Sequence, residues 1–269
     1  MKRHLAPFLI LCFCLTTNAS AQTVVDVVER PANNVTNTNY VTFRAPLQQV
    51  PLTKLPVGKI QPKGWLRKYL ELQKNGLNGQ LGTISAWLDK NNNQWLSNGG
   101  DHGWEEVPYW IRGYISLAYI LGDNAMKYEA NTWIRAVLSN QSSNGMLGPD
   151  GYDGNSPDLW AKMPMLWAMQ TYYEGTGDKR VLTAMEKYFQ WELTIPDEQF
   201  LKGLWQEKRG GDNLWSVLWA YNRTGNESIL PLVDKLHRNT SNWAMSGTLP
   251  NSHRVHIAQG LREPATYYQ

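Results

Sequence analysis

The sequence contains only two cysteines, Cys12 and Cys14, so no intrachain disulfide and no thiolate metal ligand can form beyond its first few residues. It also lacks a strong excess of one charge, because 26 Lys and Arg stand against 23 Asp and Glu, a net charge of +3. This balance excludes the basic field that drives non-specific nucleic-acid binding, and we expect no nucleic-acid partner. No apolar run is long enough to cross a bilayer, so we expect no membrane partner either.

Motifs of several common enzyme classes are also missing. The sequence has no phosphate-binding glycine loop, no Gly-x-Ser-x-Gly and no His-Glu-x-x-His, which excludes these routes to nucleotide, serine-hydrolase and zinc-protease chemistry. Phenylalanine is scarce, with 5 residues against 13 Trp and 13 Tyr. Trp and Tyr combine a flat apolar face with a polar group, and this composition suits a wet aromatic cleft that faces sugars.

The first 21 residues have the layout of a signal peptide. Residues 1–4 are basic, residues 5–15 are apolar, and residues 19–21 form the small-x-small signal for cleavage after residue 21. Cys12 and Cys14 lie too early in the apolar run for a lipidation site and serve there as apolar residues. We therefore expect export, to the periplasm or out of the cell.

The next segment, residues 22–60, is rich in Val, Thr, Asn and Pro and has no helical period, which predicts an extended arm with a short strand around 40–44. From Trp65 the apolar residues recur at helical spacing. Residues 76–103 then predict a loop-rich segment, interrupted by a short helix around 84–89.

A repeat follows, in which helices that are apolar on nearly every side alternate with helices that carry one apolar stripe. The first kind spans residues 107–121, 159–173 and 214–221, and the second kind includes residues 130–138, 181–189 and 229–236. Gly122, Gly177 and Gly225 break the chain between the two kinds, at intervals of roughly 50 residues. An all-round apolar helix is enclosed and a one-stripe helix has a face in water. The alternation therefore predicts an inner ring of helices wrapped by an outer ring.

The fold expected for residues 61–269 is accordingly all-α, an incomplete α/α toroid of the (α/α)6-barrel type. A closed barrel of six hairpins with roughly 50 residues each needs about 300 residues. Three hairpins are clear in the sequence, and a further helix begins near Arg254. We therefore expect a partial barrel, the N-terminal portion of a longer protein.

Three polar and aromatic segments lead into the inner helices, which places them at one end of the barrel. In the first segment we select Glu105 and Glu106 as candidate acids, and His102, Trp104 and Trp110 as candidate sugar contacts. Carboxylates at a helix start also favour the positive end of the helix dipole, so capping is the alternative role for both glutamates. Capping does not require the flanking aromatic residues, which favour a substrate role.

The second segment, residues 144–160, contains an acidic run at 150–158 and ends on Trp160, which we expect to stack on a sugar face. The acidic run lacks the ligand spacing and the terminal Glu of an EF-hand, so it predicts a turn-rich loop in preference to a calcium site.

The third segment, residues 205–212, is expected to be a loop with Glu207 and Asp212 near its ends and two cations between them. It could clamp a sugar, or form a salt-bridged surface loop. If the chain is active alone, its acid and base must be carboxylates, with Glu105 or Glu106 paired with Glu207 or Asp212.

At the start of the last helix, His253 and His256 share a helical face because they are three residues apart. Two histidines rarely make a zinc site by themselves, and we predict no metal site. Hydrogen bonding of either histidine to a sugar hydroxyl competes with an ordinary structural role.

Five short motifs carry a family resemblance. They are the Gly64-Trp65-Leu66 step after residues 57–63, Glu106-Val107 with Trp110, Gln141 with Asn144-Gly145 and Leu147, Tyr172 with Thr176-Gly177, and His253 with Val255. Together they resemble glycoside hydrolase family 127, the β-L-arabinofuranosidase-like family with an (α/α)6 barrel. The resemblance covers the chain from about residue 57 to the end, and implies that Glu106, Trp110 and His253 form one wall of a substrate pocket.

The chain also departs from that family. Members use a cysteine nucleophile held by a zinc ion that Cys and Glu bind, with a separate Glu as acid/base. Those residues lie downstream of the region matched here, and no cysteine follows the leader, so this machinery cannot be assigned to this chain. A histidine that members use against the sugar is replaced near Met163-Pro164. The resemblance thus implies no cofactor in this chain, and zinc only in a longer protein.

The sequence as a whole predicts an exported carbohydrate-active protein, the N-terminal portion of an α/α-barrel glycoside hydrolase that acts on an oligo- or polysaccharide. Two alternatives stay open because the fold alone does not decide the chemistry. One is a non-catalytic carbohydrate-binding or structural toroid. The other is a polysaccharide lyase of the same barrel type, in which His253 or a tyrosine removes a proton.

Overall fold

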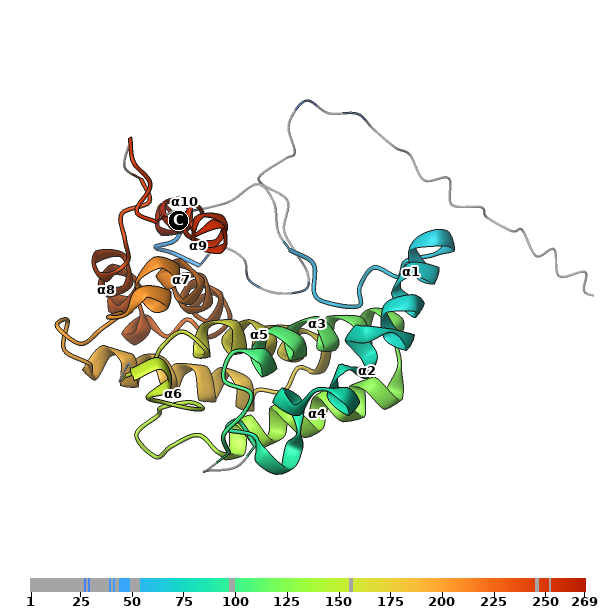
Figure 1. Ribbon diagram of the computed structural model, residues 1–269. Coiled ribbons are helices and arrows are strands. Elements are labelled where there is room, and N and C mark those ends of the chain that lie inside the picture. The colour runs from blue at the N-terminus through green and yellow to red at the C-terminus, as the bar shows by residue number, and fades with distance from the viewer. Residues whose placement is uncertain are drawn as a thin grey trace, which may run out of the picture. The chain divides into compact units, whose positions relative to one another are not determined.

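Figure 1 shows the computed structural model of the chain. It describes Val27, Glu29, Asn39, Val41 and residues 44–48, 54–96, 100–154, 157–244, 247–251 and 253–269. The chain divides into two units, Met1–Ala32 and Asn33–Gln269, and every described helix belongs to the second unit. The predicted signal peptide, residues 1–21, and most of the predicted strand at 40–44 lie outside the described residues.

The described part of the second unit is helical and contains no strand, which confirms the all-α prediction. The α-helices are α1 (Gly64–Asn75), α2 (Leu77–Ile84), α3 (Glu106–Leu121), α4 (Asn124–Ser139), α5 (Lys162–Thr176), α6 (Arg180–Thr194), α7 (Leu204–Thr224), α8 (Pro231–Asn239), α9 (Arg254–Gly260) and α10 (Glu263–Tyr267). Four 3-10 helices are η1 (Ala86–Leu88), η2 (Lys90–Asn92), η3 (Tyr152–Gly154) and η4 (Glu227–Ile229).

Tight glycine turns join the helices into hairpins. Gly122, Gly177 and Gly225 adopt left-handed φ angles of 70°, 71° and 71° at the ends of α3, α5 and α7. A side chain would strain each of these conformations, which explains why glycine stops the helix there. At the start of α4, the Asp123 carboxylate accepts a hydrogen bond from the Met126 N–H at 2.9 Å. The hairpin repeat predicted from the sequence is confirmed.

The hairpins form two layers. Helices α3, α5 and α7 pack side by side in chain order, and α9 follows against α7. Helices α4, α6 and α8 pack against one another and against the first layer (Figure 1). Because each hairpin returns the chain, α3, α5 and α7 begin at the same end.

Burial follows the pattern expected for inner and outer helices. Ile111 and Ile115 of α3 and Leu166 of α5 are fully buried, and α5 has buried residues on several sides. The outer helix α6 instead buries one stripe that includes Val181 and Tyr188. Neither α1 nor α2 contains a buried residue.

One prediction about local structure is wrong and another is incomplete. Residues 205–212 form the first turns of α7 instead of a loop. The segment at 76–103 contains η1 where a short helix was predicted around 84–89, but it also contains α2, which was not predicted. Residues 205–212 include Gly210 and Gly211, and glycine has a low helix propensity. Both glycines are buried, and a Cβ atom on Gly210 would lie 2.0 Å from Thr240 Oγ1. Close packing against α8 and α10 therefore outweighs the low helix propensity of glycine, about 1 kcal/mol per residue.

Part of the predicted arm packs on the C-terminal end of α7. The Arg44 N–H donates to Asn222 Oδ1 at 3.0 Å, and the Tyr221 hydroxyl donates to the Ala45 carbonyl. None of the helices in the described ranges has the length and apolar character needed to cross a membrane.

Candidate functional site

The N-terminal ends of the inner helices meet through their side chains. Glu105, just before α3, accepts a hydrogen bond at 2.6 Å from the indole N–H of Trp160, which precedes α5. Gln206, in the first turn of α7, accepts one at 2.6 Å from the Leu159 N–H. Glu105 makes no side-chain cap for α3, so its carboxylate is directed to the neighbouring helix start instead.

Arg209 lies at the centre of this meeting point and is only 1% exposed. Its guanidinium carbon lies 4.1 Å from the ring centroid of Trp160 and 4.7 Å from that of Trp205. Such cation–π contacts stabilise a charge removed from water. The guanidinium also donates to the Tyr109 hydroxyl at 3.4 Å and to His256 Nδ1 at 3.3 Å.

His256 completes the centre from α9, where it is fully buried. Burial, followed by the charge of Arg209, lowers the pKa of His256 to about 4, so the ring is neutral at neutral pH. Because Nδ1 accepts the bond from Arg209, we assign the ring proton to Nε2. Among the described residues the buried Nε2 has no hydrogen-bond partner.

The centre is open to solvent at its edge. His253 is exposed, and its ring centroid lies 4.7 Å from that of His256 and 5.8 Å from that of Trp205. Tyr109 is 38% exposed. We refer to Glu105, Tyr109, Trp160, Trp205, Arg209, His253 and His256 as the aromatic–arginine cluster.

A second group lies further along the same helices. Trp167 of α5 has the guanidinium of Arg112 5.0 Å and that of Arg262 4.2 Å from its ring centroid. Arg262 also forms an ion pair with the buried Asp212, which accepts a further hydrogen bond from Gln259 at 3.0 Å. We call these residues the Trp167 group.

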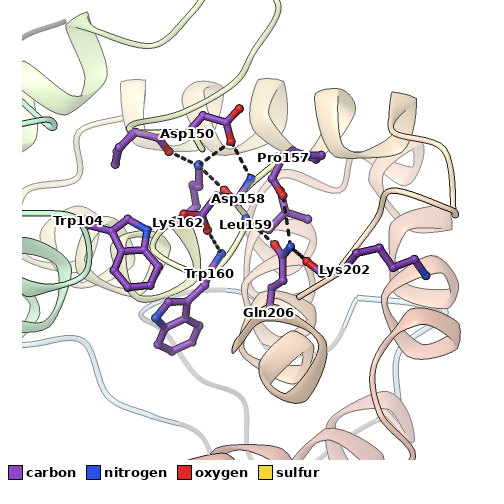
Figure 2. A network of polar contacts seen from close by, with 10 residues as sticks. Trp104, Asp150, Pro157, Asp158, Leu159, Trp160, Lys162, Lys202 and Gln206 are labelled. Carbon is purple, nitrogen blue, oxygen red and sulfur yellow. Dashed lines mark hydrogen bonds and ion pairs between the residues drawn. The ribbon is translucent and has the colours of Figure 1, made fainter. Parts of the chain in front are cut away.

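A fully buried lysine shapes the loop that carries Trp160 (Figure 2). The ammonium of Lys162 donates to the carbonyls of Pro149 and Asp158 and lies 3.8 Å from Asp150 Oδ1. Burial lowers the pKa of this ammonium, while the two aspartates favour its charge. The oxygen atoms of the acidic loop at 150–158 thus face the ammonium of Lys162.

Asp158 connects this loop to two tryptophan residues. Its two carboxylate oxygens accept from the Trp160 backbone N–H at 3.1 Å and from the Trp104 indole at 2.6 Å (Figure 2). Trp160 is therefore fixed at its backbone by Asp158 and at its ring by Glu105. Trp104 also stacks on Tyr152, with ring centroids 4.2 Å apart. Trp104 thus packs on the loop through Tyr152 and Asp158, whereas Arg209 lies over Trp160 and Trp205.

The groups of the cluster that reach solvent, the Tyr109 hydroxyl and the rings of Trp205 and His253, combine flat faces with hydrogen-bonding atoms, which suits a sugar. The family comparison agrees with this chemistry. A family model described as Beta-L-arabinofuranosidase, GH127 catalytic domain, matches residues 20–269. The chain belongs to this family. Searches among curated proteins and among solved structures return no match.

Membership in glycoside hydrolase family 127 makes this a glycoside hydrolase-like protein with a carbohydrate as the expected substrate. Of the residues selected from the sequence, the structure brings four together in the aromatic–arginine cluster: Glu105, Trp160, His253 and His256. Asp212 lies in the Trp167 group, paired with Arg262.

The other selected residues lie elsewhere. Glu207 accepts from Lys208 at 2.8 Å and from Ser241 at 2.6 Å, and so faces the segment after α8. His102 packs edge-on against Trp87, with ring centroids 5.1 Å apart. Glu106 is in the first turn of α3, and its buried Oε2 has no hydrogen-bond partner within the described ranges.

Trp110 is also separate from the cluster. It is buried among α2, α3 and α4, where its indole donates to the Asn78 carbonyl at 3.0 Å. It lines a surface pocket of about 390 Å³ together with Tyr114, Lys74 and Asp123.

Seven members of the two groups were not selected from the sequence: Tyr109, Arg112, Trp167, Trp205, Arg209, Gln259 and Arg262. Arg112 could have been selected from the sequence, because it is the only charged residue within the largely apolar stretch at 107–121. A charge inside an enclosed helix needs a polar environment, and therefore marks a functional or ion-paired position.

The zinc chemistry of the family does not fit the described residues. Both cysteines lie outside them, and no group of three His, Cys, Asp or Glu converges as a metal site within the ranges that the structure describes. His253 and His256 together offer only two ligands of the required kind. We therefore assign no zinc-dependent step to them.

Proposed function

We propose that this chain is an exported carbohydrate-active protein of glycoside hydrolase family 127, and that it holds a sugar at the aromatic–arginine cluster. Family membership supports the substrate class. The observation that carries the location is the buried Arg209 between the Trp160 and Trp205 rings, where it donates to His256 Nδ1 next to the exposed Tyr109 and His253. In this proposal the two helical layers are part of an (α/α)6-type toroid with the cluster at one end.

Each residue of the cluster has a role in this proposal. The Trp205 ring, which is half-buried, offers an apolar surface for the C–H face of a sugar. The Tyr109 hydroxyl and the exposed ring of His253 bind sugar hydroxyl groups, and the buried His256 holds Arg209 in place. Trp160 sets the position of Arg209 and of Glu105, and so positions the site without being exposed itself.

Glu105 is the carboxylate that we propose for acid/base chemistry, because it is the selected carboxylate in contact with the cluster. Glycoside hydrolysis canonically requires a proton donor at the leaving oxygen and a second carboxylate on the other side of the bond. The proposal includes no metal in this chain and assigns the second carboxylate to none of the residues described.

Activity on synthetic glycosides tests the proposal. We expect the protein to release nitrophenol from at least one glycoside in a panel that includes the β-L-arabinofuranoside. Glu105→Gln keeps an acceptor for the Trp160 indole but removes the acid, so kcat should fall about 100- to 1,000-fold. Glu198→Gln removes an exposed carboxylate and should leave kcat unchanged. Equal activity of wild type and Glu105→Gln would contradict the role of Glu105.

The same assay separates the alternatives. A non-catalytic binding protein would quench tryptophan fluorescence on addition of sugar but release no product. A polysaccharide lyase would yield an unsaturated product that absorbs in the ultraviolet, which a hydrolase does not form. If the panel gives no product of either kind and no sugar changes the fluorescence, the proposal is wrong.

Export is the remaining part of the proposal, supported by the basic, apolar and small-residue pattern of residues 1–21. The chain recovered from an exporting host should begin at Gln22 by mass spectrometry. Recovery of an uncut chain from the host cytoplasm alone would contradict it.

A further inference from the structure

The two groups on the inner helices contain more positive than negative charge. Arg112 and Arg262 flank Trp167, and Arg209 lies one turn of α7 from Asp212. Asp212 is the carboxylate that contacts these guanidiniums, through Arg262. The two groups thus contain three buried or half-buried cations and two carboxylates, Asp212, which forms an ion pair with Arg262, and Glu105, which forms none among the described residues.

Two of the three guanidiniums have no carboxylate partner within the part of the chain that the structure describes. Arg112 has Trp167 as its charge-stabilising contact. Arg209 donates to neutral groups, the Tyr109 hydroxyl and His256, and lies over indole faces, while the nearby Glu105 favours its charged form without an ion pair among the described residues. An uncompensated charge in a low-dielectric environment is costly, and such an arrangement is typical of a site that gains its counter-charge from a ligand.

The neighbouring cations contribute, after burial, to two lowered pKa values. Burial and then the charge of Arg112 lower the pKa of Arg262 to about 10. Burial and then Arg209 keep His256 neutral by lowering its pKa. In addition, the buried Nε of Arg262 and Oε1 of Gln259 have no partner among the described residues. Asp212 therefore leaves the buried Nε–H donor of Arg262 without an acceptor in the described ranges.

The excess of positive charge in the two groups bears on which sugar the site can cleave. The transition state resembles an oxocarbenium ion and is positively charged. A net positive environment opposes the formation of that charge, and a neutral sugar offers nothing to compensate it. A carboxylate on the sugar would neutralise the guanidiniums and accept paired, charge-assisted hydrogen bonds from their planar forks.

We propose that this site takes a sugar that carries a carboxylate, a uronic acid or a related acidic sugar, with its carboxylate bound by Arg112 beside Arg262. This inference rests on the proposed function, because it names the substrate class of the same site. Arg112 is then a specificity-determining residue, and the sugar ring extends toward the aromatic–arginine cluster.

Calorimetric titration with matched sugar pairs tests the inference. The pairs are the methyl glycosides of glucuronic acid and glucose, and of galacturonic acid and galactose, with methyl L-arabinofuranoside as a further neutral sugar. In at least one pair the acidic member should bind about tenfold or more tightly, and added salt should reduce the difference. Arg112→Met should abolish the preference, and Arg112→Lys should restore part of it.

Arg238→Met is the matched control, because Arg238 is exposed and pairs with Asp197 on another part of the surface. It should keep the wild-type preference. Equal or tighter binding of the neutral members overturns the inference and leaves the proposed sugar binding intact. A preference that survives Arg112→Met, in a protein with the wild-type circular dichroism spectrum, also overturns it. Absence of binding by every sugar contradicts both proposals, and the wild-type pairs decide alone if Arg112→Met does not fold.

Discussion

Several buried cations in the described part of the chain are held by neutral acceptors and aromatic rings. Arg209 is placed between indoles, and Lys162 is bound by backbone carbonyls. Lys235 likewise donates to the carbonyls of Glu192 and Ile195. Each of these contacts fixes a neighbouring backbone segment, because a buried charge left without its partners costs several kcal/mol.

Glu192 of α6 gives the clearest pH dependence. It is fully buried, accepts from Asn213 at 2.6 Å, and burial raises its pKa to about 8. The folded state therefore binds a proton that the unfolded chain, with a pKa near 4.5, has already lost at neutral pH. Glu192 thus contributes stability at low pH that is lost as the pH rises from about 4.5 to about 8.

We expect the free energy of unfolding to fall by about 2 kcal/mol between pH 6.5 and 8, and Glu192→Gln to remove most of this slope. Urea unfolding at several pH values measures it. Glu198→Gln, at an exposed position, should keep the wild-type slope. The window starts at pH 6.5 because His256, with its lowered pKa, adds an opposite slope at lower pH. An unchanged slope in Glu192→Gln would show that Glu192 is ionised in the folded protein.

At the scale of residues, the sequence predicted part of the site. Glu105, Trp160, His253 and His256 were found because each stands next to the start of an inner helix. Trp110 was selected by the same reasoning, but its ring faces the α2 side of α3. The direction of a side chain depends on how helices pack in three dimensions, and adjacency in the sequence does not contain it.

At the scale of elements, α7 shows how packing overrides local preference. Its first turns contain charged residues and the pair Gly210-Gly211, which by themselves favour a loop. The helix continues because small residues at these positions allow Thr240 and Glu263 to approach. Gly122 and Gly177 were interpreted correctly from the sequence as helix ends. Each follows directly on a helical run of apolar residues, and each adopts a left-handed conformation that ends the helix locally.

Alanine substitutions distinguish these two uses of glycine. Gly210→Ala should destabilise the protein by about 1–3 kcal/mol, because its Cβ would lie 2.0 Å from Thr240 Oγ1 and 2.9 Å from Leu201 Cδ1. Gly113→Ala, at an exposed position within α3 where the nearest atom is 3.8 Å away, should instead stabilise it by about 0.5–1 kcal/mol. Thermal unfolding of both variants measures the difference. Equal midpoints would mean that α7 and α8 are not packed this closely.

At the scale of the whole molecule, hairpins in two layers bring the starts of α3, α5, α7 and α9 to one end. This arrangement collects residues that lie far apart in the sequence, such as Tyr109 and His256, around a single guanidinium. Family membership indicates a carbohydrate substrate, and our proposal places the sugar at this convergence. The repeat could be predicted from the sequence. The charge balance of the inner face could not, because it depends on which side of each helix faces inward.

The central claim is that a sugar binds at the aromatic–arginine cluster, and nitrogen-15 NMR of the tryptophan indoles tests it most directly. Each indole N–H gives its own signal, which Trp→Phe substitution assigns. Addition of methyl glucuronoside or methyl L-arabinofuranoside should shift the signals of Trp160 and Trp205 and leave that of Trp133, which is bonded to Glu129 within the outer layer, in place. Shifts confined to Trp110 and Trp133, with Trp160 and Trp205 unchanged, would contradict the account.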